Sequence, residues 1–249
     1  MYAFFIDIDG TIFNGKSVSD KVIDTFERAR KAGHKVFINT ARAYIGMPEQ
    51  VYTLPVDGFV NSHGLEIYTD NKFIHRYFIP QEQLHEIAEY CFDNDINMYF
   101  EGEVRIDINK DDSSGLYPKN IEQFKGMLGE KRISKFIFYK SPSDKEKNRF
   151  SKDFNILGLE GVLKGYSKSY GIKIIEDYYG IPSENTVAIG DTNQDIDMVT
   201  YAGIGISMGN GSNDLKECAK YITKTCAEDG VAFAIDCLLN DDFSKLEKE

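Results

Sequence analysis

Two aspartates, Asp7 and Asp9, close the first apolar stretch of the chain, in the sequence YAFFIDIDGT. Side chains alternate along a strand, so residues two positions apart project from the same face. Two carboxylates so close repel each other, and a shared proton or a bound cation must offset the repulsion. Oxygen-rich sites of this kind suit Mg²⁺. The pair therefore predicts acid–base or metal chemistry at the end of a buried strand.

A second acidic loop, GDTNQDIDM, follows the apolar run VAI and contains Asp191, Asp195 and Asp197. It begins like an EF-hand loop, but Ile196 stands where that loop needs its turning glycine, and Ala202 where it needs a bidentate glutamate. We instead expect Asp191 at the end of a neighbouring strand, facing the first aspartate pair across the crevice of the sheet. For Asp195 and Asp197, the alternative is that they are charges at a helix N-terminus.

Two further stretches could contact a phosphate group. In NTAR, the hydroxyl of Thr40 and the neighbouring backbone N–H groups could hold phosphate oxygens. In KGYSKSYG, Lys168 precedes a helix and so lies at the positive end of its dipole, which is unfavourable unless anions are near. A solvent-facing lysine is the alternative interpretation.

The elements that must position these residues alternate between strands and helices. Residues 2–8 and 34–40 are near-continuous apolar runs joined by an amphipathic segment at 19–33, which is typical of parallel strands covered on both faces. The last third repeats this order, beginning with a helix over 170–181 and a strand at 186–190. The sequence predicts an α/β fold with a doubly wound parallel sheet.

The middle of the chain has a different pattern, in which pairs of strand-like stretches are flanked by helical ones. This indicates an inserted α+β module at 81–158, within a discontinuous core made of 1–80 and 159–249.

The composition excludes several classes of protein. The 249 residues carry a formal net charge of −11, which disfavours nucleic acid and anionic membranes as partners. We expect a cytoplasmic protein, because no stretch is long and apolar enough for a transmembrane helix and no basic leader precedes the first strand. The four cysteines have no metal-ligand spacing and are expected to be free thiols: Cys91, Cys218, Cys226 and Cys237. The sequence carries no signal for an oligomeric state.

The order of DIDGT, NTAR, a lysine before a helix, and GDxxxD resembles the haloacid dehalogenase superfamily. The inserted module resembles that of its Cof-type phosphatases with a class IIB cap. The stretches KGYSK, AGIGISMGNG and EDGVAFAI support the resemblance, which covers the whole chain. It implies a Rossmann-like core with an inserted α+β cap.

The resemblance also implies roles for single residues. Asp7 matches the nucleophile that forms an aspartyl-phosphate, and Asp9 matches the general acid/base. Thr40 matches the phosphate-binding hydroxyl, and Lys168 the lysine that neutralises nucleophile and phosphate. Asp191 matches a Mg²⁺ ligand, joined by the Asp7 carboxylate and the Asp9 backbone carbonyl.

Two positions depart from the pattern of the family. Gln194 stands where GDxxND has asparagine, and Ala41 stands where TGR has glycine. Both lie beside the expected phosphate site, and Arg42 is a candidate substrate contact there. Asp195 matches a second acidic residue near the metal.

We therefore expect a Mg²⁺-dependent phosphatase that hydrolyses small phosphate monoesters, foremost sugar phosphates. A phosphomutase or phosphotransferase of the same superfamily and a non-catalytic phospholigand-binding protein are the alternatives. A dinucleotide site is disfavoured, because GxGxxG read from Gly203 would need glycine at Met208.

Overall fold

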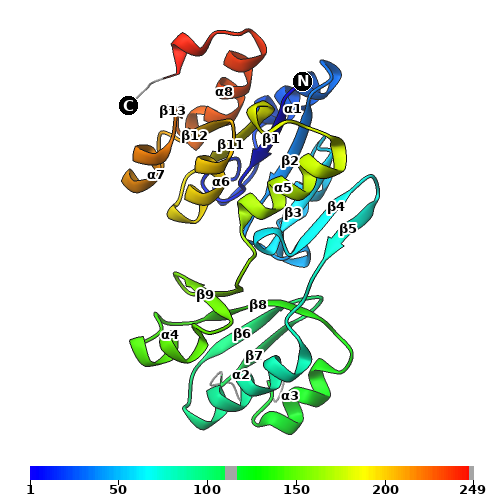
Figure 1. The fold of residues 1–249 in the computed structure, drawn as a ribbon, viewed down its shortest axis with the longest axis vertical. Coiled ribbons are helices and arrows are strands. Elements are labelled where there is room, and N and C mark those ends of the chain that lie inside the picture. The colour runs from blue at the N-terminus through cyan, green and yellow to red at the C-terminus, as the bar shows by residue number, and fades with distance from the viewer. Residues whose placement is uncertain (110–116, 247–249) are drawn as a thin grey trace. The chain divides into compact units, whose positions relative to one another are not determined.

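The computed structural model describes residues 1–109 and 117–246, which form two compact units (Figure 1). The first unit consists of Met1–Arg42, Met47–His75 and the chain from Ser167 onward. The second consists of Arg76–Tyr166 together with the short segment Ala43–Gly46. The second unit thus covers more of the sequence than the module expected at 81–158. That the units act as catalytic core and cap stays a prediction.

An eight-stranded sheet forms the centre of the first unit. Its strands, in spatial order, are β13 (Tyr221–Ile222), β12 (Ile204–Ser207), β11 (Thr186–Gly190), β1 (Ala3–Ile6), β2 (Lys35–Asn39), β3 (Gly58–Asn61), β4 (Glu66–Thr69) and β5 (Lys72–Arg76). Pairing is parallel from β13 to β3, and β3 pairs with β4 antiparallel. The predicted doubly wound parallel sheet is confirmed, and the hairpin of β4 and β5 extends it.

Both faces of this sheet are covered. The helices of the unit are α1 (Asp20–Lys31), α5 (Lys168–Tyr179), α6 (Ile196–Tyr201), α7 (Asn213–Cys218) and α8 (Gly230–Leu239). On one face, Phe5 and Phe37 stack with ring centroids 5.3 Å apart and belong to the same apolar core as Ile172 and Ile175 of α5. Phe4 and Val36, one residue before Phe5 and Phe37, point to the opposite face of the sheet and are also fully buried. Helix α1 packs against β2 and α8.

Helix α5, which begins at the lysine of interest, has a defined start and end. The side chain of Ser167 accepts a hydrogen bond from the backbone N–H of Tyr170, which caps the first turn. Gly180 follows the last residue with φ +64°, a left-handed conformation that glycine adopts without strain. The first residue of the helix, Lys168, is therefore held at a fixed place at the edge of the sheet.

The second unit contains an antiparallel sheet of five strands. In spatial order these are β7 (Arg105–Ile108), β6 (Met98–Gly102), β8 (Ile133–Phe138), β10 (Glu160–Leu163) and β9 (Phe154–Leu157), and the helices are α2 (Gln81–Asp93), α3 (Ile121–Leu128) and α4 (Asp144–Phe150). The hairpin of β9 and β10 turns at Gly158, with φ +64°, and its strands were not anticipated from the sequence.

Short 3₁₀ helices connect these elements at Tyr44–Gly46, Glu49–Thr53, Ser62–Gly64, Ser183–Asn185, Asn193–Asp195, Cys226–Glu228 and Phe243–Lys245.

Candidate active site

Three neighbouring strands of the first unit end in residues predicted for the site. Asp7 follows β1, Thr40 follows β2 and Asp191 follows β11. Strand β1 lies between the other two and pairs with both in parallel, with Ile6 opposite Ile38 and Ile189. Because parallel strands end at the same edge of a sheet, these three residues converge there.

A cluster of three carboxylates lies at this edge. Asp7, Asp191 and Asp195 each offer one oxygen, and these oxygens all lie within 4.8 Å of one another. Asp7 and Asp195 are buried and Asp191 is half-buried. The resemblance implies the main chain of Asp9 as a metal ligand and Asp195 as an acidic residue near the metal. The cluster of side-chain oxygens contains Asp195 together with Asp7 and Asp191. An all-oxygen donor set of this kind fits a hard divalent cation such as Mg²⁺.

Lys168 joins two members of this cluster. Its ammonium nitrogen lies 2.7 Å from Oδ1 of Asp7 and 2.5 Å from Oδ1 of Asp195. The other oxygen of Asp195 accepts hydrogen bonds from the backbone N–H groups of Asp191, at 3.0 Å, and Thr192, at 2.9 Å. If all groups are ionised, three carboxylates and one ammonium leave two negative charges, which a divalent cation would neutralise.

Burial and the crowding of charges shift the pKa values of the cluster. Burial raises the pKa of Asp7, the nearby Asp195 and Asp191 raise it further, and Lys168 opposes them. Burial and Asp195 also raise the pKa of Asp191 to about 6, although Thr11 donates a hydrogen bond to it at 3.1 Å. Burial alone would lower the pKa of Lys168, but Asp195 and Asp7 raise it above its ordinary value. The two carboxylates therefore favour the ammonium form of Lys168.

Two glycines make room for this cluster. Gly10 has φ +78°, and an added Cβ atom would collide with Oδ2 of Asp191. A Cβ atom on Gly190, the last residue of β11, would collide with the carboxyl group of Asp195. The glycines of DIDGT and GDTNQD are thus required by close approach of the carboxylates. Sequence reasoning did not single them out, although each adjoins an acidic motif.

Asp9 points to a different partner. The guanidinium of Arg42 binds its carboxylate with two hydrogen bonds, 2.6 Å from Nε to Oδ2 and 2.9 Å from Nη2 to Oδ1. The buried hydroxyl of Thr40 accepts a hydrogen bond from the backbone N–H of Arg42 at 3.2 Å. Ala41 lies half-buried between them, and Gln194 is half-buried in the 3₁₀ turn before α6. Arg42 therefore connects the expected proton donor to the expected phosphate loop.

Asp197 lies in the first turn of α6, where the sequence suggested a helix N-terminal charge. Its carboxylate also accepts a hydrogen bond from the backbone N–H of Ser169 in the first turn of α5, at 2.8 Å. Asp197 thus ties the lysine helix to the second acidic loop.

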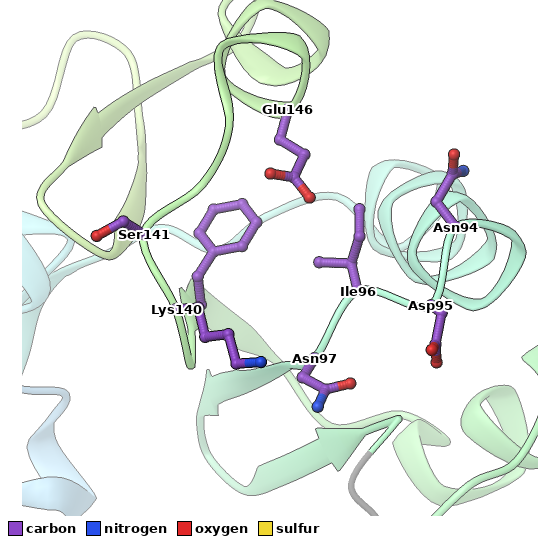
Figure 2. Close-up of a pocket in the computed structure, with 8 residues that line it drawn as sticks. Asn94, Asp95, Ile96, Asn97, Lys140, Ser141 and Glu146 are labelled. Carbon is purple, nitrogen blue, oxygen red and sulfur yellow. The ribbon is translucent and has the colours of Figure 1, made fainter.

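A separate pocket of about 320 Å³ lies in the second unit (Figure 2). Ile96 and Phe138 supply its apolar part, and Lys140 and Glu146 extend into it from the end of β8 and from α4. None of the residues predicted for the site lines it. The acidic cluster in the first unit remains the candidate active site.

Comparison with known proteins agrees with this fold. Residues 4–235 match the family model of the haloacid dehalogenase-like hydrolases, and the chain belongs to this family. Within the family it is a phosphatase. The 5-amino-6-(5-phospho-D-ribitylamino)uracil phosphatase YitU of Bacillus subtilis is 28% identical, over 93% of this chain and 95% of its own.

Solved structures share the fold. BT1666 from Bacteroides thetaiotaomicron, one of the phosphatases of the superfamily, superposes with a TM-score of 0.81 at 24% identity, over 95% of this chain and 94% of its own. The subclass IIB sugar phosphatase BT4131 gives a TM-score of 0.76 at 24% identity, over 96% and 99%. These likenesses confirm the predicted fold class. In the residues that the structure describes, no helix is both long and apolar enough to cross a bilayer.

Proposed function

We propose that this phosphatase is a Mg²⁺-dependent hydrolase of small phosphate monoesters, foremost sugar phosphates, and that Asp7 carries the phosphoryl group as an aspartyl-phosphate. The observation that carries the proposal is the buried contact of Lys168 with Asp7, 2.7 Å long, inside a cluster with two further carboxylates. With all groups ionised, the three carboxylates around this one ammonium leave a surplus of two negative charges, which a divalent cation would balance.

The nucleophile is oriented by this contact. Lys168 donates a hydrogen bond to Oδ1 of Asp7, so Oδ2 is the oxygen that attacks phosphorus. The bond from Oδ2 to phosphorus forms while the bond to the leaving oxygen breaks. Phosphoryl transfer depends mainly on positioning and charge neutralisation, which Lys168 provides from one side. Mg²⁺, held by Asp7, Asp191 and the neighbouring oxygens, would supply Lewis-acid stabilisation of the phosphoryl charge.

Asp9 handles the proton in both steps. Protonated Asp9 gives its proton to the leaving oxygen, and the resulting carboxylate then takes a proton from the water that attacks the aspartyl-phosphate. This releases phosphate and restores Asp7. Arg42 binds both oxygens of Asp9 in this structure. A substrate phosphate would compete for the guanidinium and so leave the Asp9 carboxyl group free to face the leaving oxygen.

The substrate class is supported by the relatives. YitU is named for a phosphorylated ribitylamino compound, and BT4131 is described as a sugar phosphatase.

The test is phosphate release by the purified protein from a panel of sugar and sugar-alcohol phosphates, with a folded phosphoprotein as the bulky comparison. We expect turnover of the small esters with Mg²⁺ and none after chelation. A second sugar is added as acceptor, because transfer of the phosphoryl group to it in place of water would identify a mutase. Binding of the esters without phosphate release would identify a non-catalytic protein.

A further inference from the structure

Asn39, the last residue of β2, lies directly beside Asp7 in the sheet. The parallel register places Ile6 opposite Ile38, and continuing it by one residue places Asp7 opposite Asn39. Both side chains point to the same face as Phe5 and Phe37, which belong to the core under α5. Asn39 is fully buried. A buried amide therefore adjoins the residue proposed as nucleophile.

The amide of Asn39 contacts the main chain of the active-site lysine. Its Nδ2 donates a hydrogen bond to the backbone carbonyl of Lys168 at 3.0 Å. A carbonyl oxygen has two lone pairs, so it can accept this bond in addition to its helical one. Lys168 is thus held at both ends, by Asn39 at its backbone and by Asp7 and Asp195 at its ammonium.

The other end of the amide indicates that stability is not the reason for this residue. Oδ1 of Asn39 is buried and has no hydrogen-bond partner among the described residues. An unpartnered buried oxygen destabilises a fold, and an apolar side chain of the same size would avoid that cost. The contact of Nδ2 with Lys168 offers a reason to keep an amide at this position.

We propose that Asn39 is a positioning residue for the phosphatase reaction. It fixes the first turn of α5 so that the ammonium of Lys168 stays between Asp7 and Asp195. An amide suits this place, because it donates a hydrogen bond without adding charge beside three carboxylates. This inference rests on the proposed function, which gives Asp7 and Lys168 their roles.

Two substitutions test the amide. Asn39→Leu keeps the approximate size and removes the donor, and Asn39→Asp keeps the shape but places a carboxylate against the Lys168 carbonyl and beside Asp7. We expect kcat to fall by about 10- to 100-fold in Asn39→Leu, the range typical of outer-shell partners, and further in Asn39→Asp, with KM nearly unchanged. The rate of phosphoenzyme formation in a single turnover should fall in parallel.

The matched control is Thr186→Val. Thr186 is also fully buried and donates a side-chain hydrogen bond to a backbone carbonyl, that of Ser183, at 2.7 Å. It is the first residue of β11, at the opposite end of the sheet from the site. This variant should lose thermal stability and keep its kcat.

Two outcomes would overturn the proposal: wild-type kcat in Asn39→Leu, or an equal loss of kcat in Thr186→Val, which would make the effect one of general stability. If Asn39→Leu does not fold, the kcat of the near-isosteric Asn39→Asp is compared with that of Thr186→Val in its place. A wild-type kcat in Asn39→Asp would then overturn the proposal. Asp7→Asn is measured alongside. Activity in Asp7→Asn would refute the proposed function itself, whereas an inactive Asp7→Asn with a fully active Asn39→Leu refutes only the role of Asn39.

Discussion

Among the described residues, each unit of this phosphatase has a buried lysine held between two carboxylates. Lys168 in the first unit lies 2.7 Å from Asp7 and 2.5 Å from Asp195, and its side chain is 2% exposed. Lys135 in the second unit lies 3.4 Å from Glu101 and 3.0 Å from Glu160, and its side chain is 3% exposed. Burial and ion pairing alone therefore do not distinguish an active-site lysine from a structural one.

The surroundings of the two lysines differ. The partners of Lys135 stand on β6 and β10, the strands that flank its own strand β8, so the three form cross-strand pairs with 16% and 19% exposed carboxylate side chains. The partners of Lys168 follow the ends of parallel strands and adjoin a third carboxylate, Asp191. The surplus of buried negative charge, and not the lysine, marks the site that is suited to a cation.

The largest expected effect is the loss of the nucleophile. Asp7→Asn is nearly isosteric but gives a poor nucleophile, so turnover should fall by several orders of magnitude and no phosphoenzyme should form. Glu101→Gln, the matched change beside Lys135, should retain most of the turnover. Steady-state phosphate release and acid-quenched labelling measure the two quantities. Wild-type-like turnover in Asp7→Asn would contradict the mechanism.

Metal removal should have the next largest effect. Chelation should abolish turnover, Mg²⁺ should restore it, and Ca²⁺ should compete with Mg²⁺ and inhibit. Mg²⁺ needs a tight octahedron, whereas Ca²⁺ accepts bidentate carboxylates and can occupy both oxygens of Asp7. The measurement is phosphate release at fixed Mg²⁺ during a Ca²⁺ titration. Full activity in the chelated protein, or equal activity with Ca²⁺ alone, would exclude the site.

The two lysines can be compared directly by replacing each with methionine. Lys168→Met leaves the buried carboxylates of Asp7 and Asp195 without their ammonium partner, and breaking a buried pair of this kind lowers the free energy of unfolding by about 3–5 kcal/mol. Lys135→Met should cost less, because water reaches its partners. Urea unfolding measures both free energies, first in chelator and then with Mg²⁺ in excess over the chelator. Mg²⁺ should restore part of the stability of Lys168→Met and none of that of Lys135→Met. The idea fails if Mg²⁺ stabilises the two variants equally.

The smallest expected effect is a pH dependence away from the site. Burial lowers the pKa of His34, with a further contribution from the N-terminal amine, and the backbone N–H of Tyr2 donates to its Nδ1 at 2.8 Å. The unfolded chain therefore binds more protons than the folded one just below pH 6.5, so stability should fall as the pH drops through about 6.5. His34→Gln should flatten this part of the melting-temperature profile. An unchanged difference between wild type and variant from pH 5 to 8 would contradict it.

The strand ends were predictable from the sequence, whereas their partners were not. Asp7 and Asp191 follow apolar runs, and parallel strands converge at one edge, so their proximity followed from alternation and topology. The contacts of Asp9 with Arg42 and of Asn39 with Lys168 join residues 33 and 129 positions apart and depend on side-chain direction, which no local pattern encodes. The β9–β10 hairpin was missed because β9 is only partly buried and so lacks the continuous apolar pattern of the core strands.

The crowding of Gly10 and Gly190 against carboxylates determines how this site can diversify. At both positions even a methyl group would collide with an aspartate that the site needs. In a library of random variants, active clones should therefore accept substitutions at these two positions as rarely as at the aspartates themselves, although glycine has no reactive group. Adaptation to new esters would then have to arise at other positions, because the glycines beside the acidic cluster leave no room for a larger side chain.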